Sequence, residues 1–434
     1  MPPFERSWPE LKHPSYRKRN LISTENWLHD KQTDDGAEGL WRIHDKLYDL
    51  HGFMEKHPGG AQWLEITKGT DCTESFESHH LGGKAEAILP KYFAREASAP
   101  RNSPYTFHDD GFYRTLKKRV SKTLETLPKE DIKIRSKIIM DSLVLTSLSL
   151  AVMAAHWNSY RTAALSGVFL AFAAICSHNF FHQKDNWRMY YFNLSLMSVS
   201  RDWRISHVLS HHPFTNTLQD LEITSYEPFF NYLPDPEKSW AVRYLSWIYW
   251  PLVHGTIFHT RKSAPALRGN QKFIHNTFTW PDVLGLIIPV LLCIANGGYI
   301  LSGVLMWTWL ILISSFVFGA IDIVSAHHHP KLFHEGDAPR YKQDRDWGLA
   351  QIDAARDRQE FTGILPLVLI AFGDHTLHHL FPTVDHSILK YLYPVVMDTC
   401  KDFGFDFKMT STFDLAIGQF RQLARNKPNT IPPQ

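Results

Sequence analysis

The chain has 434 residues and a mass of 50.2 kDa, which is enough for about two or three domains and excludes a peptide hormone or a disulfide mini-scaffold. Its 46 Lys and Arg residues nearly balance its 44 Asp and Glu residues, so the basic charge of a general nucleic-acid binder is missing and we expect no nucleic-acid partner. The four cysteines are far apart and form no CxxC pair, which argues against a disulfide framework or a thiolate zinc site and fits a reducing compartment.

The first part of the chain, residues 20–97, is polar and mixed. Short hydrophobic runs at 40–43 and 47–50 are broken by turn residues, a pattern that predicts a small α+β domain. The N-terminus has no basic start followed by an apolar run, so we expect no cleaved secretory signal and a head that stays in the cytosol.

Residues 98–134 are expected to connect this head to the rest of the chain. They begin with a stretch rich in Pro, Ser and Asp, which is typical of a linker. Residues 112–137 then hold nine Lys or Arg against three acids, which favours a juxtamembrane segment on anionic lipid. An ordinary solvated helix is the alternative.

Residues 135–410 are predicted to form an all-α membrane domain with four transmembrane helices in two hairpins. About 20 apolar residues span the hydrocarbon core of a bilayer. Residues 138–155 carry only Asp141 as a charge, and residues 162–182 carry no Asp, Glu, Lys or Arg. Residues 283–321 also lack charge, and Asn296-Gly297-Gly298 divides them into two helices.

The distribution of basic residues predicts the orientation of these helices. The two expected far-side turns hold only Arg161, whereas the flanking segments are rich in Lys and Arg. The positive-inside rule therefore places both termini and the long loops in the cytosol. Residues 411–434 are predicted to be a C-terminal tail with an amphipathic stretch that packs on the head or lies on the membrane.

A histidine on a sharp turn stands out in the head. His57 is followed by Pro58, Gly59 and Gly60, and the two glycines allow tight backbone geometry and close approach of a flat ligand. The tetrapeptide alone is a weak signal. The residues around it strengthen a haem interpretation, namely Trp41, Ile43, Asp49, Phe53, Gly69, Asp71, Thr73, Phe76, His79 and His80.

This pattern resembles the cytochrome b5 haem domain. The resemblance implies two axial histidines that hold a haem b from both sides and leave no open position, so that the domain carries electrons. His57 corresponds to the first axial ligand. Plain cytochrome b5 domains place the second histidine where this chain has Leu81, whereas His80 matches the domains fused to acyl desaturases. His80 is therefore the expected second ligand, and His79 is the alternative.

Three histidine clusters lie on the expected cytosolic side of the body. Neutral imidazoles suit iron, zinc or copper, and these clusters hold too many for one ion, so we expect a dinuclear centre whose metal the spacing does not identify. Asp374 and Asp202 are close enough in sequence to accept hydrogen bonds from ligating imidazoles. The clusters consist of His178 and His182, of His207, His211 and His212, and of His375, His378 and His379.

The order of spans and clusters is similar to that of the membrane fatty acid desaturase and hydroxylase superfamily. Two motifs carry the resemblance, one running from His211-His212 to Thr215-Asn216 and one from His378 to Thr383. With the head, the chain resembles the cytochrome b5-fused desaturases, and within them a group of insect cytochrome b5-related proteins. The family also implies a further iron ligand after the fourth span, where we favour His328 over His327.

Membership in this family implies a function. Two non-haem iron ions would activate O2 and desaturate a lipid acyl chain or an acyl-CoA, with electrons from NADH-cytochrome b5 reductase passing through the haem. The expected location is the endoplasmic reticulum membrane. The third cluster begins with His375 where front-end desaturases have Gln, and the second has one extra intervening residue. Because of these departures, hydroxylation and a non-catalytic electron-transfer or regulatory role stay open.

Overall fold

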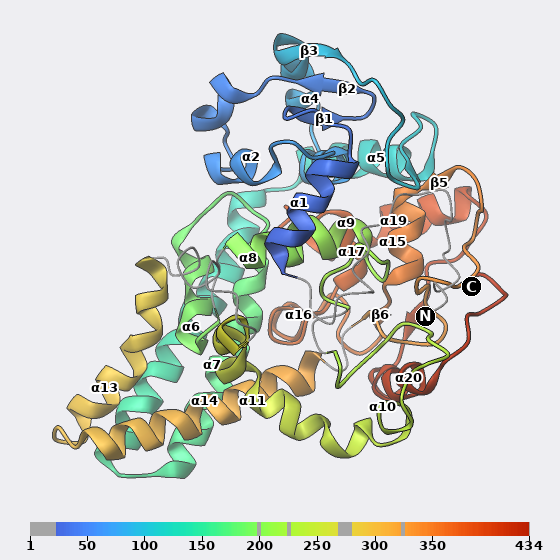
Figure 1. Cartoon of the computed structure of the whole chain (residues 1–434). Helices are drawn as coiled ribbons and strands as arrows, with labels where there is room; N and C mark the ends of the chain where they lie inside the picture. Colours follow the sequence, from blue (N-terminus) through green and yellow to red (C-terminus); the bar gives the residue numbers. More distant parts are fainter. Residues whose placement is uncertain (1–22, 198–200, 224–226, 268–279, 323–325, 434) are drawn as a thin grey trace.

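The computed structural model describes residues 23–197, 201–223, 227–267, 280–322 and 326–433 (Figure 1). A small head with a β-sheet lies at the top of this view, and a larger, mostly helical body lies below it. The expected α+β head followed by a helical body is confirmed.

The head is built on a three-stranded antiparallel sheet in the order β1-β2-β3, with strands Trp41–Ile43, Lys46–Tyr48 and Phe93–Glu96. Its apolar core consists of Trp41, Ile43, Tyr48, Leu50 and Phe76. The helices of the head are α1 (Thr24–Asp34), α2 (Ala61–Thr67), α3 (Thr73–His79) and α4 (Lys84–Ile88).

The head and the body share a second hydrophobic core. Trp27 and Leu28 of α1 pack in one buried cluster with Trp347 and Leu377 of the body. The Trp27 indole N–H also donates to the Gln219 carbonyl over 2.9 Å. The head is therefore fixed on the body by apolar packing and by a buried hydrogen bond.

The segment expected to be a linker is structured and paired with both domains. Arg101 contacts the Asp71 carboxylate of the head at 2.7 Å, and β4 (Tyr105–Thr106) pairs in parallel with β5 (Arg345–Asp346) of the body. Helix α5 (Phe112–Thr126) follows and buries one side of its surface, including Tyr113 and Leu116. Five of the nine basic residues predicted to lie on lipid therefore belong to a helix that also packs on protein.

Three helices among the described residues are long and apolar enough to cross a membrane. They are α6 (Lys129–His156), α7 with the turn that extends it (Tyr160–Phe180), and α14 (Ile300–Asp322). Helices α7 and α14 approach closely at Gly167, where an added Cβ would lie 2.5 Å from the Leu310 carbonyl oxygen. Small residues of this kind let membrane helices pack backbone to backbone.

The third of the four expected spans is shorter than predicted. Residues 283–295 form the end of a 3-10 turn (Trp280–Leu286) and helix α13 (Ile287–Ala295), which is followed by Gly297 and Gly298 at positive φ angles of 80° and 89°. The glycines close a tight turn into α14, since they adopt positive φ readily. Four spans in two hairpins are therefore not confirmed.

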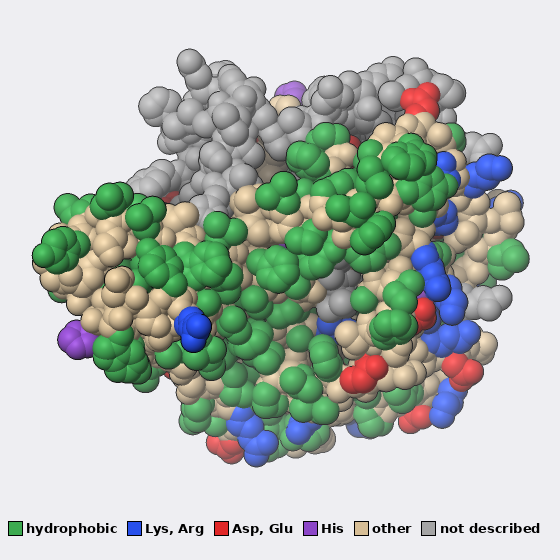
Figure 2. All heavy atoms as spheres, turned by 90° about the horizontal axis from the view of Figure 1, so that it is seen from below, with side chains coloured by type: hydrophobic (Ala, Val, Ile, Leu, Met, Phe, Trp, Pro, Cys, Tyr) green, Lys and Arg blue, Asp and Glu red, His purple; other side chains and the backbone are tan. Residues whose placement is uncertain are grey.

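Apolar side chains cover the underside of the body. Figure 2 shows this surface, over which hydrophobic side chains gather with few charges among them. Large exposed apolar patches mark contact with a membrane or a partner. Helices α6, α11 (Ser246–Leu267), α13 and α14 each carry highly exposed apolar side chains, which include Leu145, Leu252, Ile294 and Leu301.

The remaining α-helices and strands belong to the body. The predicted C-terminal tail forms α20 (Thr412–Ala424), which packs against α10 (Trp240–Tyr244) and α11. The other elements are α8 (Arg201–Trp203), α9 (His212–Phe214), α15 (Trp347–Ala354), β6 (Asp357–Arg358), α16 (Leu365–Ile370), α17 (His375–Leu380), α18 (His386–Leu389), α19 (Tyr393–Asp402) and β7 (Met409–Thr410), which pairs in parallel with β6.

Candidate metal centres

His57 and His80 lie opposite each other in the head. Their ring centroids are 6.2 Å apart, and the Nδ1 atoms are hydrogen-bonded to the carbonyls of Gly60 and Phe76 at 2.9 and 3.0 Å. Because each Nδ1 is occupied, each Nε2 is available to a metal. Phe76 also packs its ring 4.7 Å from the His80 ring. The pair fits the two axial positions of a haem.

His79, the alternative second ligand, has different surroundings. Its Nδ1 lies 3.0 Å from the carbonyl of Ser75 and 3.0 Å from the Ser78 hydroxyl. Its ring centroid lies 6.0 Å from that of His182 in the body. The geometry therefore pairs His80, rather than His79, with His57.

A first group of imidazoles in the body joins all three histidine clusters. The ligand atoms of its five members lie within 4.8 Å of one another, and all five residues are buried. The Nε2 atoms of His178 and His207 are 2.8 Å apart. The members are His178, His182, His207, His212 and His378.

A second group lies beside the first. His211, His327 and His379 bring their ligand atoms within 4.8 Å of one another, and the His375 Nε2 lies 2.8 Å from the His327 Nε2. The two groups meet where the rings of His212 and His379 stack with centroids 4.1 Å apart. All eight predicted cluster histidines are thus brought together, and they divide into two adjacent groups.

The local backbone explains how neighbouring histidines reach different groups. Residues 204–211 form a π-helical stretch, and the His212 amide donates to the His207 carbonyl, a spacing of five residues. Short π-helical turns occur frequently at functional sites. This turn puts His207 and His212 in the first group and His211 in the second, and His207 also approaches His211 beside Glu222.

The buried nitrogen atoms of these groups fit metal ions. Neither ring nitrogen of His182 or of His378 has a hydrogen-bond partner among the described residues, and the His379 Nε2 has none either. An unpaired buried polar atom costs about 1–3 kcal/mol. Such atoms concentrated in one place indicate a ligand, and imidazole nitrogens suit iron, zinc and copper. The residues present therefore fit two adjacent metal ions.

Hydrogen bonds from surrounding residues orient the second group. The Nδ1 atoms of His211, His327 and His379 lie 3.0, 3.0 and 3.2 Å from Asp220 Oδ2, the Ala354 carbonyl and Gln351 Oε1. Such contacts fix the ring and direct Nε2 toward the metal. His207 has a similar neighbour in the first group, because its Nδ1 lies 3.1 Å from a Glu222 carboxylate oxygen.

These carboxylates differ from the ones expected from the sequence. The Asp374 carboxylate accepts from the Gly363 amide and the Tyr393 hydroxyl, and Asp202 accepts from the Thr24 hydroxyl. The prediction of Asp374 is therefore wrong, because its partners are not ligating imidazoles, and the role of Asp202 stays a prediction. Burial and the nearby Asp357 raise the pKa of Asp374 to about 7.

The electrostatics of the groups follow from burial. Burial keeps the pKa values of His212, His375 and His379 well below the usual value, so these rings are neutral and their lone pairs are free for a metal. His211 is the exception. Although its burial opposes protonation, the carboxylates of Asp220 and Glu222 raise its pKa to about 9.

The structure corrects the choice among the three histidines after α14. The sequence favours His328 as a ligand, but its ring stacks on Tyr232 with centroids 3.6 Å apart, outside both groups. His327 is the member of the second group instead. The Asn216 side-chain amide fixes this backbone by donating to the His327 carbonyl at 3.0 Å.

His386 also lies near the first group, although it belongs to none of the predicted clusters. Its ring centroid is 4.8 Å from that of His378 and 6.0 Å from that of His178. Both of its ring nitrogens are buried without a hydrogen-bond partner among the described residues. His386 stands alone in the sequence, so no spacing pattern identifies it.

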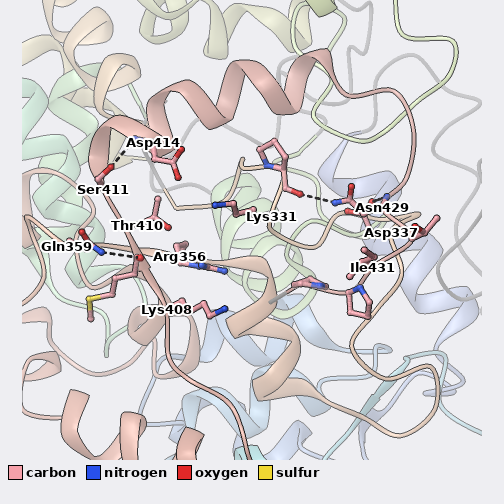
Figure 3. A pocket seen from close by; sticks show the side chains of 15 residues that line it. Lys331, Asp337, Arg356, Gln359, Lys408, Thr410, Ser411, Asp414, Asn429 and Ile431 are labelled. Atoms are coloured by element: carbon pink, nitrogen blue, oxygen red, sulfur yellow. Dashed lines mark hydrogen bonds between the residues drawn. The ribbon is translucent and has the colours of Figure 1, made fainter.

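A cavity of about 860 Å³ lies elsewhere, beside α20 and β7 (Figure 3). Lys331, Arg356 and Lys408 give it positive charge, and Asp337 and Asp414 give it negative charge. Its lining includes no histidine of the head pair or of the two groups. The cavity is therefore separate from the candidate metal centres.

Comparison with known families matches both parts of the chain. Residues 24–98 match the family "Cytochrome b5-like Heme/Steroid binding domain", and residues 155–411, more than half of the chain, match the family "Fatty acid desaturase". The chain therefore belongs to the fatty acid desaturase family and carries a cytochrome b5 domain in front of its desaturase domain. These domains imply haem in the head and iron in the body, with which the two histidine groups agree.

Individual relatives agree with this assignment. The chain is 42% identical to a "Cytochrome b5-related protein" of Drosophila melanogaster, over 99% of this chain and 98% of that protein. It is 24% identical to "Acyl-lipid (8-3)-desaturase B" of Dictyostelium discoideum, over 87% and 89%, and 23% identical to "Acyl-lipid (8-3)-desaturase" of Mortierella alpina, over 86% and 90%. No solved structure matches the chain. The expected resemblance to cytochrome b5-fused desaturases and to insect cytochrome b5-related proteins is confirmed.

Proposed function

We propose that this protein is an O2-dependent lipid desaturase that carries its own electron donor. The observation that supports this function best is the pair of adjacent imidazole groups, which lie in the same chain as a bis-histidine haem site. His57 and His80 hold a haem b. The body holds two non-haem iron ions through His178, His182, His207, His212 and His378 on one side and His211, His327, His375 and His379 on the other.

The residues of the chain position and insulate these cofactors. When bound, the iron ions supply the activation of O2 and the removal of hydrogen from an unactivated C–H bond. His182, His378 and their neighbours are buried, so bulk water is kept away from the reacting atoms. Asp220, Gln351 and the Ala354 carbonyl hold three of the ligand rings in one orientation.

The substrate is a lipid acyl chain or an acyl-CoA, and the electrons come from NADH-cytochrome b5 reductase. The relatives named acyl-lipid desaturases and the apolar helices support a substrate that enters from the bilayer. The proposed location is the endoplasmic reticulum membrane, with four segments in two hairpins and both termini in the cytosol. The scarcity of Lys and Arg in the expected far-side turns supports this orientation.

Product analysis in yeast tests this function. Cells that express the wild type are supplied with labelled acyl chains and sphingoid bases and compared with cells that express His378→Ala. Exposed His108, replaced by Ala, is the matched control because its ring pairs only with the surface carboxylate of Asp344 among the contacts described. We expect a product lighter by about 2 Da in the wild type and in the control but not in His378→Ala.

Two observations favour a second function. The relative at 42% identity is named only for its relation to cytochrome b5, and the histidine clusters depart from those of front-end desaturases. A haem-binding electron-transfer or regulatory protein with a non-catalytic body would give no new product while retaining haem and both irons. Both desaturation and hydroxylation begin with removal of the same hydrogen. A lipid hydroxylase would then add an oxygen atom and give a product heavier by about 16 Da.

A further inference from the structure

His79 lies at the boundary between the head and the body and belongs to neither metal-binding site. It is adjacent in sequence to His80, whose ring faces His57 across the proposed haem site. Its own ring centroid lies 6.0 Å from that of His182, a member of the first imidazole group. His79 therefore lies between the two sites. Its backbone is bonded to His80 of the proposed haem site, and its ring lies near His182 of the first imidazole group.

The His79 ring is held in this position without using its second nitrogen. Its Nδ1 is fixed by the Ser75 carbonyl and the Ser78 hydroxyl at 3.0 Å each. The Nε2 atom is buried and has no hydrogen-bond partner among the described residues. A buried, unpaired nitrogen is costly to keep, so a purely structural role accounts poorly for a histidine here.

Contacts between the head and the body keep the rings of His79 and His182 at a fixed separation. The Tyr113 hydroxyl lies 3.0 Å from the Leu380 carbonyl of α17 and 3.4 Å from the Glu77 carbonyl of α3. It thus joins the helix that precedes His80 to the helix that carries His378. The Thr383 hydroxyl lies 3.5 Å from the His79 carbonyl oxygen and adds a contact from the body.

We propose that His79 is the side chain through which electrons pass from the head to the body, an inference that rests on the proposed function. In each transfer one electron leaves the ferrous haem iron, which becomes ferric, and one ferric non-haem ion becomes ferrous. No bond forms or breaks, and no proton has to move. Electrons leave the head at the His80–His79 backbone and enter the body at the ring of His182.

Flash photoreduction of the full-length, metal-loaded protein under argon tests this route without substrate or O2. An added flavin photoreductant reduces the haem, and the haem absorbance then reports how fast the electron leaves for the ferric non-haem iron. The variants are His79→Leu, which removes the ring, and His79→Phe, which keeps a ring in the same place. His51→Leu is the matched control, because His51 is a head histidine that lies beside Asp49 and Trp41.

We expect His79→Leu to bind haem and non-haem iron like the wild type and to reoxidise its haem several-fold more slowly. His79→Phe should recover most of the rate, and His51→Leu should leave it unchanged. A wild-type rate in His79→Leu would overturn the proposal. So would loss of the Soret band in that variant, since His79 would then be a haem ligand, or a rate in His79→Phe as slow as in His79→Leu.

The His378→Ala variant separates this inference from the proposed function. If the haem of that variant loses its electron as fast as the haem of the wild type, the electron does not go to a centre that needs His378, and the proposed function fails. If the transfer depends on His378 but is the same in His79→Leu and in the wild type, only the route through His79 is wrong.

Discussion

Three consecutive histidines end in three different environments. His327 joins the second imidazole group, His328 stacks on Tyr232, and the His329 Nε2 lies 3.5 Å from an Asp414 carboxylate oxygen. Adjacent side chains of an irregular segment point in different directions, so only one of the three reaches the site. The difference is decided by the backbone at Ala326 and His327, which hydrogen bonds from the Arg356 amide and the Asn216 side chain fix.

Replacing His327 and His328 separately tests this placement. We expect His327→Ala to lose at least half of its non-haem iron, since metal binding falls steeply when a ligand is removed. His328→Ala, the matched control, should retain this iron. Haem absorbance should be unchanged in both variants. The measurement is iron content after subtraction of haem, and loss of non-haem iron from His328→Ala alone would contradict the placement.

The sequence alone predicts most of the metal-ligating histidines, but it does not predict the residues that hydrogen-bond to them. The eight cluster histidines could be predicted because their spacing is local and the clusters recur. Asp220 and Glu222 could not, because isolated carboxylates in a loop resemble ordinary surface residues until the fold brings them to His211 and His207. His386 escaped prediction for the same reason.

At the scale of elements, α3 and α5 are joined by a buried cluster of charges. The Glu77 carboxylate lies 2.8 Å from the Lys117 ammonium and 2.8 Å from the His44 ring, and it also pairs with Arg114. Burial alone would raise the pKa of Glu77, but these partners hold that pKa well below its usual value of 4.5. The charged form of Glu77 therefore stabilises the junction of the two helices.

This cluster predicts a pH dependence of stability. A carboxyl group whose pKa is lowered on folding stabilises the protein above its unfolded pKa, near 4.5, and this stabilisation is lost as the pH falls through the pKa of the folded state. We expect Glu77→Gln to lower the free energy of unfolding at pH 7 by about 3–5 kcal/mol, because buried cations lose their partner. Thermal unfolding of the full chain, followed by haem absorbance, measures both effects.

The matched control for this experiment is Asp402→Asn, which removes an exposed carboxylate that pairs with Arg119 of α5. Exposed pairs contribute about 0–1 kcal/mol, so its stability should remain close to that of the wild type at each pH. If Glu77→Gln lost stability below pH 4.5 as steeply as the wild type does, another group would carry the acid sensitivity.

Composition predicts some of the apolar helices of the body and misses others. Residues 138–155 and 162–182 were predicted as spans, and α6 and α7 confirm both helices. Residues 283–321 lack charge throughout, but the break at 296–298 leaves a first arm shorter than a full span. Helix α11 was missed because its apolar residues are interrupted by polar ones, and it is positioned by packing against α14.

At the scale of the whole molecule, the head and the body meet through shared packing, whereas the turns between apolar helices lie at the other end of α6 and α7 (Figure 1). The proposed orientation therefore predicts that exposed Lys91 of the head and exposed Arg161 at the start of α7 lie on opposite sides of the membrane.

Cysteine labelling in sealed microsomes checks this orientation. In a background without the four native cysteines, we expect Lys91→Cys to react with a membrane-impermeant maleimide in intact vesicles. Arg161→Cys should react only after the vesicles are opened with detergent. Labelling of Arg161→Cys in intact vesicles, with a soluble lumenal protein still protected, would contradict the proposed orientation.

The Tyr113 hydroxyl, which holds α3 of the head against α17 of the body, has a consequence for kinetics. Two sites that are fixed together act at an effective concentration of about millimolar or more, without any collision between separate carriers. Electron transfer from the haem site of the head to the metal centre of the body is then a first-order process. Diluting the protein in the lipid phase leaves its rate unchanged, whereas a donor that diffuses separately would slow in proportion to the dilution.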